Sequence, residues 1–163
     1  MKTLYLLRHA KSSWESPDVD DFQRPLNERG ETDAPKMGKR LREKNVLPEI
    51  IYSSTAVRAL STAKIIANCL NYPEDKIHAD RTLYHADEEK LWSYVHHVAN
   101  EYDSIMIVGH NPGLTDFANE LVDESIDNIP TAGVVAVEFP AHTWKEMKEG
   151  SGELVFFDFP KKD

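Results

Sequence analysis

Apolar and polar positions along the chain follow two alternating patterns. Short, largely apolar runs are typical of strands covered on both faces of a parallel sheet, and they occur at residues 2–7, 48–54 and 103–110. Segments in which apolar residues recur every three or four positions predict helices, and they occur at residues 31–44, 55–70, 87–101 and 114–122. A polar stretch separates two later apolar runs, which indicate an antiparallel pair of strands, at residues 133–139 and 153–159.

This alternation predicts an α/β fold, a three-layer α/β/α sandwich with a mostly parallel central sheet. The chain has 163 residues, of which 40% are hydrophobic. A domain of this size buries about two-thirds of the surface that its unfolded chain exposes. We therefore expect a single domain over residues 1–163, and nothing in the pattern asks for a second core or for more than a monomer.

The net charge and the cysteine content indicate which partners and which cellular environment to expect. The formal net charge is −9, and polyanions and anionic lipids are bound by basic excess, so we expect neither nucleic acid nor a membrane as a partner. No apolar run approaches the ~20 residues of a spanning helix. The single cysteine, Cys69, has no intrachain partner for a disulfide. These features favour a cytoplasmic protein in a reducing compartment.

Basic and imidazole side chains follow three of the predicted strands. Arg8 and His9 end the first strand, and Arg58 lies near the start of the helix that follows the second. His110 follows the third strand in a Gly-His-Asn-Pro-Gly turn. Taken singly, Arg58 could be an exposed helix residue and His110 an ordinary turn residue. Because ligands bind beyond the carboxyl ends of parallel strands, the three strand ends together predict one site.

These residue types suit phosphate chemistry. An arginine presents a planar fork of donors that matches pairs of phosphate oxygens. The helix start, with Ser54 as its expected N-cap, adds backbone amides and a partial positive charge. A neutral imidazole can attack phosphorus directly, and we assign this role to His9. A protonated His110 would donate to a phosphate oxygen as charge develops in the transition state.

Four motifs extend the picture beyond these residues: RHAKSSW (8–14), RPLNERG (24–30), SSTAVRALSTA (53–63) and VGHNPGL (108–114). In this order and spacing they resemble the histidine phosphatase superfamily, with the phosphoglycerate mutase-like fold, and most closely its small SixA-type phosphohistidine phosphatases. The resemblance implies a metal-independent phosphatase without a cofactor, in which His9 carries the phosphate transiently. It places Arg8, Arg58 and His110 in the phosphate pocket, and it makes protein phosphohistidine one candidate substrate.

The resemblance does not identify a single residue as the proton donor for the leaving group. Many members of the superfamily use a glutamate from the region after the middle strand, which here reads LYHADEEKLW, residues 83–92. His85 is a candidate donor, because an imidazole side chain can give up a proton near neutral pH. The acidic residues are equally well explained as charges that complement the N-terminus of a helix; they are Asp87, Glu88 and Glu89.

Other residues near the motifs are candidates for substrate contact. We expect Lys11, Ser12 and Arg24 at the rim of the pocket; the alternatives are that Lys11 only adjusts the local electrostatic field and that Arg24 is a structural residue of its turn. Trp14 lies close enough in sequence to wall the pocket. Ala10 follows the motif histidine where many members have glycine, and a small residue still allows the loop to turn.

Two further functions fit the same residues. One is a phosphatase or phosphomutase for a small molecule such as a sugar phosphate or nucleotide, although the chain leaves little sequence for the insertions that close a mutase site. The other is a regulatory module that binds phosphorylated partners without turnover. Binding alone needs the arginines but not a nucleophile, so His9 favours the enzyme.

Overall fold

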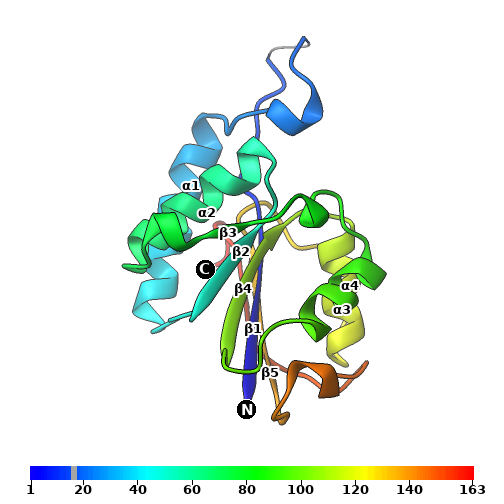
Figure 1. Ribbon diagram of the computed structural model, residues 1–163. Helices are drawn as coiled ribbons and strands as arrows, with labels where there is room; N and C mark the ends of the chain where they lie inside the picture. Colours follow the sequence, from blue (N-terminus) through cyan, green and yellow to red (C-terminus); the bar gives the residue numbers. More distant parts are fainter. Residues whose placement is uncertain (16–17) are drawn as a thin grey trace.

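Six strands form one mixed sheet in the computed structural model, which describes residues 1–15 and 18–163 (Figure 1). The strands are β1 (Lys2–Arg8), β2 (Ile50–Ser53), β3 (His78–Ala79), β4 (Ser104–Gly109), β5 (Val134–Phe139) and β6 (Glu153–Asp158). Their order is β3-β2-β4-β1-β5-β6. The first four in this order are parallel, β5 runs antiparallel to β1, and β6 runs antiparallel to β5. The mostly parallel sheet and the antiparallel terminal pair are confirmed.

Four helices cover the two faces of this sheet. They are α1 (Glu28–Glu43), α2 (Val57–Cys69), α3 (Glu88–His96) and α4 (Gly113–Leu121). Helices α1 and α2 lie on one face and α3 and α4 on the other (Figure 1). Short 3-10 turns include η1 (Asp21–Gln23) and η3 (Arg81–Leu83). The predicted three-layer α/β/α sandwich is confirmed.

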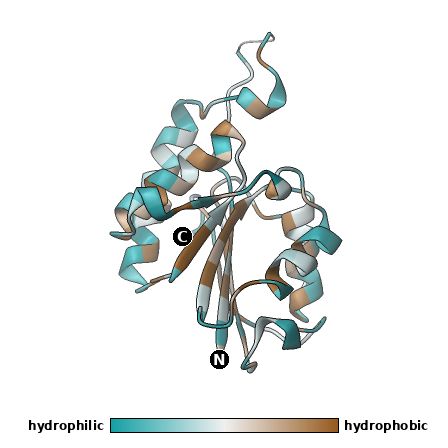
Figure 2. Ribbon diagram, viewed as in Figure 1, coloured by the Kyte–Doolittle hydropathy of each residue, from teal (hydrophilic) through white to brown (hydrophobic). Residues whose placement is uncertain are grey.

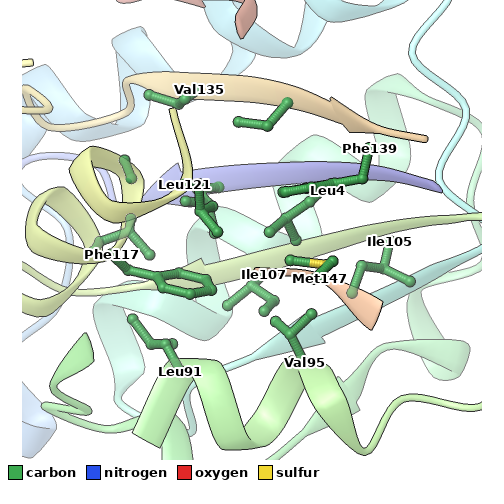
Figure 3. Close-up of a cluster of buried hydrophobic side chains, with 14 of the residues drawn as sticks. Leu4, Leu91, Val95, Ile105, Ile107, Phe117, Leu121, Val135, Phe139 and Met147 are labelled. Atoms are coloured by element: carbon green, nitrogen blue, oxygen red, sulfur yellow. The ribbon is translucent and has the colours of Figure 1, made fainter. Parts of the chain in front are cut away.

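Each face of the sheet carries its own hydrophobic core, because successive residues of a strand point to opposite faces. Leu4 and Leu6 pack with Phe117 on the side of α3 and α4 (Figure 3), whereas Leu7 belongs to the core under α1 and α2. The central strands β1 and β4 are therefore apolar on both faces, while the helices are polar on their outer sides (Figure 2). This double burial explains why the strands are nearly continuous apolar runs in the sequence.

Two helix boundaries and one strand differ from the predictions. Helix α1 starts three residues earlier than expected, because the Asn27 side chain caps it by accepting from Gly30 N at 2.9 Å. Helix α3 ends at His96, because the next residues turn and present the carbonyls of Asn100 and Tyr102 to the buried Lys2 ammonium. Strand β3 has only two residues, both exposed, so no apolar run announces it.

The register of the sheet brings the carboxyl ends of three parallel strands together. Arg8 at the end of β1 pairs with Gly109 at the end of β4, and Ser53 at the end of β2 pairs with Val108. The loops that leave these strands therefore begin side by side. Over the described ranges, none of the helices is both long and apolar enough to cross a membrane.

Candidate active site

His9 lies where β1 ends, and neighbouring elements hold its backbone. Its N–H donates to the carbonyl oxygen of Gly109 at 3.1 Å, and the N–H of Ala10 donates to Thr62 Oγ1 on α2 at 2.9 Å. Thr62 in turn donates to the carbonyl oxygen of Arg58 at 2.8 Å. The loop that follows β1 is thus fixed against α2, which sets the position of the His9 ring.

The imidazole of His9 is a neutral base. Its Nδ1 lies 2.7 Å from the carbonyl oxygen of Ala10, which can only accept, so Nδ1 carries the proton and Nε2 keeps a free electron pair. Burial lowers the pKa of His9 to about 4; the bond to Ala10 opposes this effect, and the charges of three nearby arginines add to it. At neutral pH the ring is uncharged and its Nε2 is a nucleophile.

His110 is the second buried imidazole of the cluster, with its ring centroid 5.2 Å from that of His9. Its Nε2 lies 2.8 Å from Ser54 Oγ, which also accepts from the N–H of Ala56. The Ser54 hydroxyl keeps its own hydrogen and can give it to Nε2; in this tautomer Nδ1 carries the ring proton. Burial, followed by the charges of His9 and Arg58, holds the pKa of His110 well below its usual value.

The structure differs from two predictions, one about Ser54 and one about His110. Ser54 does not cap α2: the N-cap is Ala56, and no side chain caps it. The Ser54 hydroxyl instead orients His110 from the strand end. The second change concerns His110, which was expected to donate as a protonated ring. The neutral ring already presents an Nδ1–H, so no second proton is needed to contact a phosphate oxygen.

Arg8 and Arg58 approach the imidazoles from two elements. Arg8 is half-buried at the end of β1, where its Nη1 donates to the carbonyl oxygen of Ile129 at 2.9 Å. Arg58 lies on the first turn of α2, as predicted, and is 3% exposed. Its Nη1 donates to the backbone oxygen of Asp21 at 2.6 Å, and its Nη2 donates to Asp21 Oδ2 at 3.0 Å. Burial and then the charge of Arg58 lower the pKa of Arg8.

Several donors in this cluster are buried without a partner among the described residues; they are Arg8 Nε, Arg24 Nε and Nη1, Arg58 Nε and His110 Nδ1. A buried donor without an acceptor costs about 1–3 kcal/mol, so a group of them from separate elements needs an explanation. All five are N–H groups that surround His9, and a tetrahedral oxyanion would supply their acceptors. This arrangement is chemically suited to hold a tetrahedral oxyanion beside the free Nε2 of His9.

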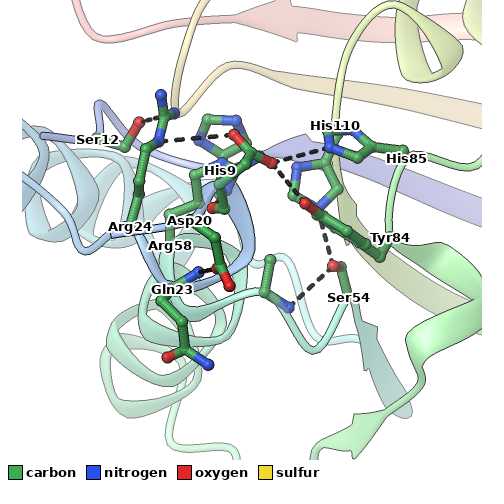
Figure 4. A network of polar contacts seen from close by, with 12 residues as sticks. His9, Ser12, Asp20, Gln23, Arg24, Ser54, Arg58, Tyr84, His85 and His110 are labelled. Carbon is green, nitrogen blue, oxygen red and sulfur yellow. Dashed lines mark hydrogen bonds and ion pairs between the residues drawn. The ribbon is translucent and has the colours of Figure 1, made fainter. Parts of the chain in front are cut away.

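The residues predicted at the rim of the pocket differ in burial and in their contacts. Arg24 is 7% exposed and donates to Ser12 Oγ at 2.5 Å (Figure 4). Its guanidinium carbon also lies 3.4 Å from the ring centroid of Trp14, so Trp14 covers Arg24 instead of walling the pocket directly. Burial and then the charge of Arg58 lower the pKa of Arg24, which therefore belongs to the positive cluster. Lys11 is exposed, and its backbone oxygen accepts from Asn27 N.

Asp21 and Tyr84 join the cluster although sequence reasoning missed both. Asp21 Oδ2 accepts from Tyr84 Oη at 2.6 Å, from His85 Nε2 at 2.9 Å and from Arg58 Nη2. Partial burial raises the pKa of Asp21, but the hydrogen bonds from these three residues outweigh it and hold the pKa well below its usual range. A sequence signal for Asp21 was available, since an acidic residue three positions before the RPLNERG motif could pair with the predicted arginines.

The four candidate proton donors occupy different places. His85 stacks between Tyr84 and His110, with ring centroids at 4.1 Å and 5.2 Å, and has a left-handed backbone with φ of 54°. Such a backbone is uncommon outside glycine and often marks a functional position. Asp87 caps α3 by accepting from Lys90 N at 2.9 Å. The remaining two, Glu88 and Glu89, lie in the first turn of that helix, as expected for charges that complement it.

Comparison with known proteins places this arrangement in a family. The family model described as histidine phosphatase superfamily, branch 1, matches residues 4–87. An uncharacterized chloroplastic protein of Arabidopsis thaliana is 31% identical over 159 residues, which cover 93% of this chain and 72% of that protein.

Solved structures give the same result for the whole fold. The SixA protein from Agrobacterium tumefaciens superposes with a TM-score of 0.84 at 28% identity, covering 98% of each chain. The protein histidine phosphatase SixA complexed with tungstate superposes with a TM-score of 0.83 at 21% identity, covering 97% of each chain. The similarity extends over both layers of helices and the full sheet.

Proposed function

Because the chain belongs to the histidine phosphatase superfamily and has the fold of its SixA-type members, we propose that it is a phosphatase that works through a covalent phosphohistidine on His9. The family and these neighbours support an enzyme that hydrolyses or transfers phosphate. The observation that carries the finer proposal is the free Nε2 of His9 among buried, unpartnered N–H donors. No step of the proposed reaction needs a metal ion.

The first half of the reaction transfers phosphate to the protein. Nε2 of His9 attacks phosphorus and forms an N–P bond, while the bond between phosphorus and the leaving group breaks and its electron pair goes to the leaving atom. The N–P bond makes the ring cationic, and the Nδ1–H bond to Ala10 stabilises that charge. Arg8, Arg58 and His110 Nδ1–H hold the phosphoryl oxygens, whose charge they match in the transition state.

The second half returns the enzyme to its starting state. Water attacks the phosphorus of the phosphohistidine and releases one proton to the solvent, the N–P bond breaks, and its electron pair returns to Nε2. Inorganic phosphate leaves, and His9 is again neutral. Covalent catalysis of this kind divides one difficult displacement into two easier ones.

Protein phosphohistidine is the substrate class that we favour. The imidazole of such a substrate leaves from nitrogen, which can already carry its proton, so it depends least on a donor from the enzyme. Trp14 stands 74% exposed beside Arg24 in the segment between β1 and α1. An open rim suits a phosphorylated side chain presented by another protein.

The experiment compares wild type with His9→Ala on 4-nitrophenyl phosphate and on a phosphohistidine peptide, each with and without EDTA. We expect His9→Ala to lose turnover on both substrates, and EDTA to change neither rate. His142→Ala is the matched control, since His142 is exposed and follows β5 at the opposite end of the sheet, where Phe139 pairs with Lys2.

Each outcome has a separate meaning. Undiminished turnover by His9→Ala, or loss of activity with EDTA, contradicts the mechanism. A faster reaction on 4-nitrophenyl phosphate and sugar phosphates than on the peptide identifies a small-molecule phosphatase. Phosphate binding without turnover in wild type identifies a binding module.

A further inference from the structure

Asp21 connects the phosphate-binding side of the site with the residue best placed to protonate the leaving group. Its Oδ2 accepts from Arg58, which belongs to the phosphate-binding cluster, and also from Tyr84 and His85. Its backbone oxygen accepts from Arg58 as well. A carboxylate that accepts from three side chains is itself fixed, and it fixes them.

We propose that Asp21 is a positioning residue that holds the His85 imidazole beside the phosphate pocket, where His85 gives a proton to the leaving atom of the substrate. The proposal rests on the proposed function, since it assumes a phosphoryl group transferred to His9. It distinguishes His85 from the acidic residues of α3, which are occupied in capping and charging that helix.

The hydrogen bond to Asp21 determines which nitrogen of His85 can act. The carboxylate only accepts, so Nε2 of His85 carries a proton whether the ring is neutral or charged. The proton that can be given away is therefore the one on Nδ1. When the bond from phosphorus to the leaving atom breaks, its electron pair takes this proton, and the imidazole remains as the neutral Nε2–H form still bound to Asp21.

The neighbouring rings hold His85 in place from the other directions. Tyr84 stacks on it with centroids 4.1 Å apart and donates its hydroxyl to the same carboxylate oxygen. His110 lies 5.2 Å from His85, and the ring of His9 lies 5.2 Å from that of His110. The proposed donor and the nucleophile thus both lie next to His110, whose unpartnered Nδ1 is a proposed contact of the phosphoryl group. The left-handed backbone of His85 turns the side chain into this stack.

A second observation shows that Asp21 is more than a surface charge. Helix η1 begins at Asp21, and Asp20 caps it by accepting from Gln23 N at 3.0 Å, so the backbone that carries the carboxylate is itself ordered. Arg24 Nε lies 3.7 Å from Asp21 Oδ1. The carboxylate therefore lies within a cage of donors that are parts of the site.

The test uses leaving groups of increasing basicity, namely 4-nitrophenyl phosphate, phenyl phosphate and an alkyl phosphate. Loss of a general acid affects a basic leaving group far more than a good one, whereas loss of phosphate binding affects all three alike. We expect Asp21→Asn to reduce kcat/KM by less than about 10-fold on 4-nitrophenyl phosphate and by about 100-fold or more on the alkyl phosphate. His85→Gln should reproduce this pattern.

The double variant adds a second criterion. If Asp21 acts through His85, Asp21→Asn combined with His85→Gln is no slower on the alkyl phosphate than His85→Gln alone. Inorganic phosphate as a competitive inhibitor reports the binding side independently, and we expect its inhibition constant to change by less than about threefold. Asp18→Asn, which removes an exposed charge from the same loop, should leave all three rates unchanged.

Three results would overturn the proposal. An equal loss on all substrates, with weaker inhibition by phosphate, would mean that Asp21 only orders Arg58. An equal gain on all substrates, with tighter inhibition, would mean that the carboxylate competes with the substrate phosphate. An unchanged pattern in either single variant would mean that the proton comes from elsewhere. Equal activity of wild type and His9→Ala is a separate result: it refutes the proposed function itself, and with it the basis of this proposal.

Discussion

The buried neutral state of His9 has a consequence for stability that can be measured without any substrate. In the unfolded chain the ring takes up a proton near its ordinary pKa of 6.5, whereas burial keeps the folded ring neutral down to about pH 4. Between these two values the unfolded state binds more protons than the folded state. The free energy of unfolding therefore falls as the pH falls through this window.

The structure sets the size of the effect. Each pH unit across the window costs about 1.4 kcal/mol per proton, so lowering the pKa from 6.5 to about 4 corresponds to about 3 kcal/mol for His9. The contribution is complete above pH 6.5 and lost below pH 4. His110 adds to it with the same sign, because burial lowers its pKa as well. This loss is a large part of the 5–15 kcal/mol that typically stabilises a domain.

Urea unfolding at several pH values between 7.5 and 4.5, in buffers free of phosphate and at constant ionic strength, measures this loss. We expect His9→Asn to lose less stability than wild type across the window, with a difference of about 2–3 kcal/mol. His142→Asn, an exposed histidine, should follow wild type. Parallel curves for wild type and His9→Asn would refute the reasoning, because they would mean that the folded ring takes up its proton near the ordinary pKa.

Three further changes test the supports of the site. Arg58→Lys keeps a charge but cannot hold Asp21 and a phosphoryl group together; we expect kcat/KM to fall by about 10-fold to 100-fold, measured by steady-state kinetics. Gly30→Ala places a Cβ 2.1 Å from the backbone oxygen of Lys11 and should lower both the melting temperature and kcat. Lys2→Met removes a buried ammonium far from the site and should cost about 2 kcal/mol of unfolding free energy while kcat stays unchanged.

Matched variants separate these effects from general damage. Gly38→Ala lies on the same helix as Gly30 but meets the side chain of Cys69, so it should lower stability without lowering kcat. An Arg58→Lys enzyme with wild-type kinetics would show that Arg58 does not contact the phosphoryl group. A Lys2→Met protein with altered kcat would show that the two ends of β1 are coupled. Gly30→Ala with unchanged melting would mean that α1 moves freely against the loop after His9.

Local sequence patterns were sufficient to predict the architecture of the fold. Strands buried on both faces must be apolar throughout, so β1 and β4 were recognisable as short runs, and helical spacing located all four helices. Element ends were harder, because contacts distant in sequence determine them. The Lys2 ammonium donates to two carbonyl oxygens of the segment after α3, and these contacts end that helix early. Strand β3 forms because two exposed residues pair with the edge of β2.

In the candidate site, too, some residues were predictable from local sequence patterns and others were not. Arg8, His9, Arg58 and His110 follow strand ends, and a parallel sheet brings such ends together. Asp21 and Tyr84 reach the cluster through loops and bind residues 37 and 63 positions away, distances at which no sequence period operates. The tautomer of His9 likewise depends on a single carbonyl oxygen, which only coordinates can place.

The central claim is that His9 carries the phosphate. Its most direct test is rapid mixing of the protein with a ³²P-labelled phosphohistidine peptide, quenching in alkaline detergent within the first turnover, and mapping of the label by mass spectrometry. The account predicts label on His9 that mild acid removes and that excess unlabelled substrate displaces. Label on another residue, or complete turnover with no label on the protein at any time, would contradict it.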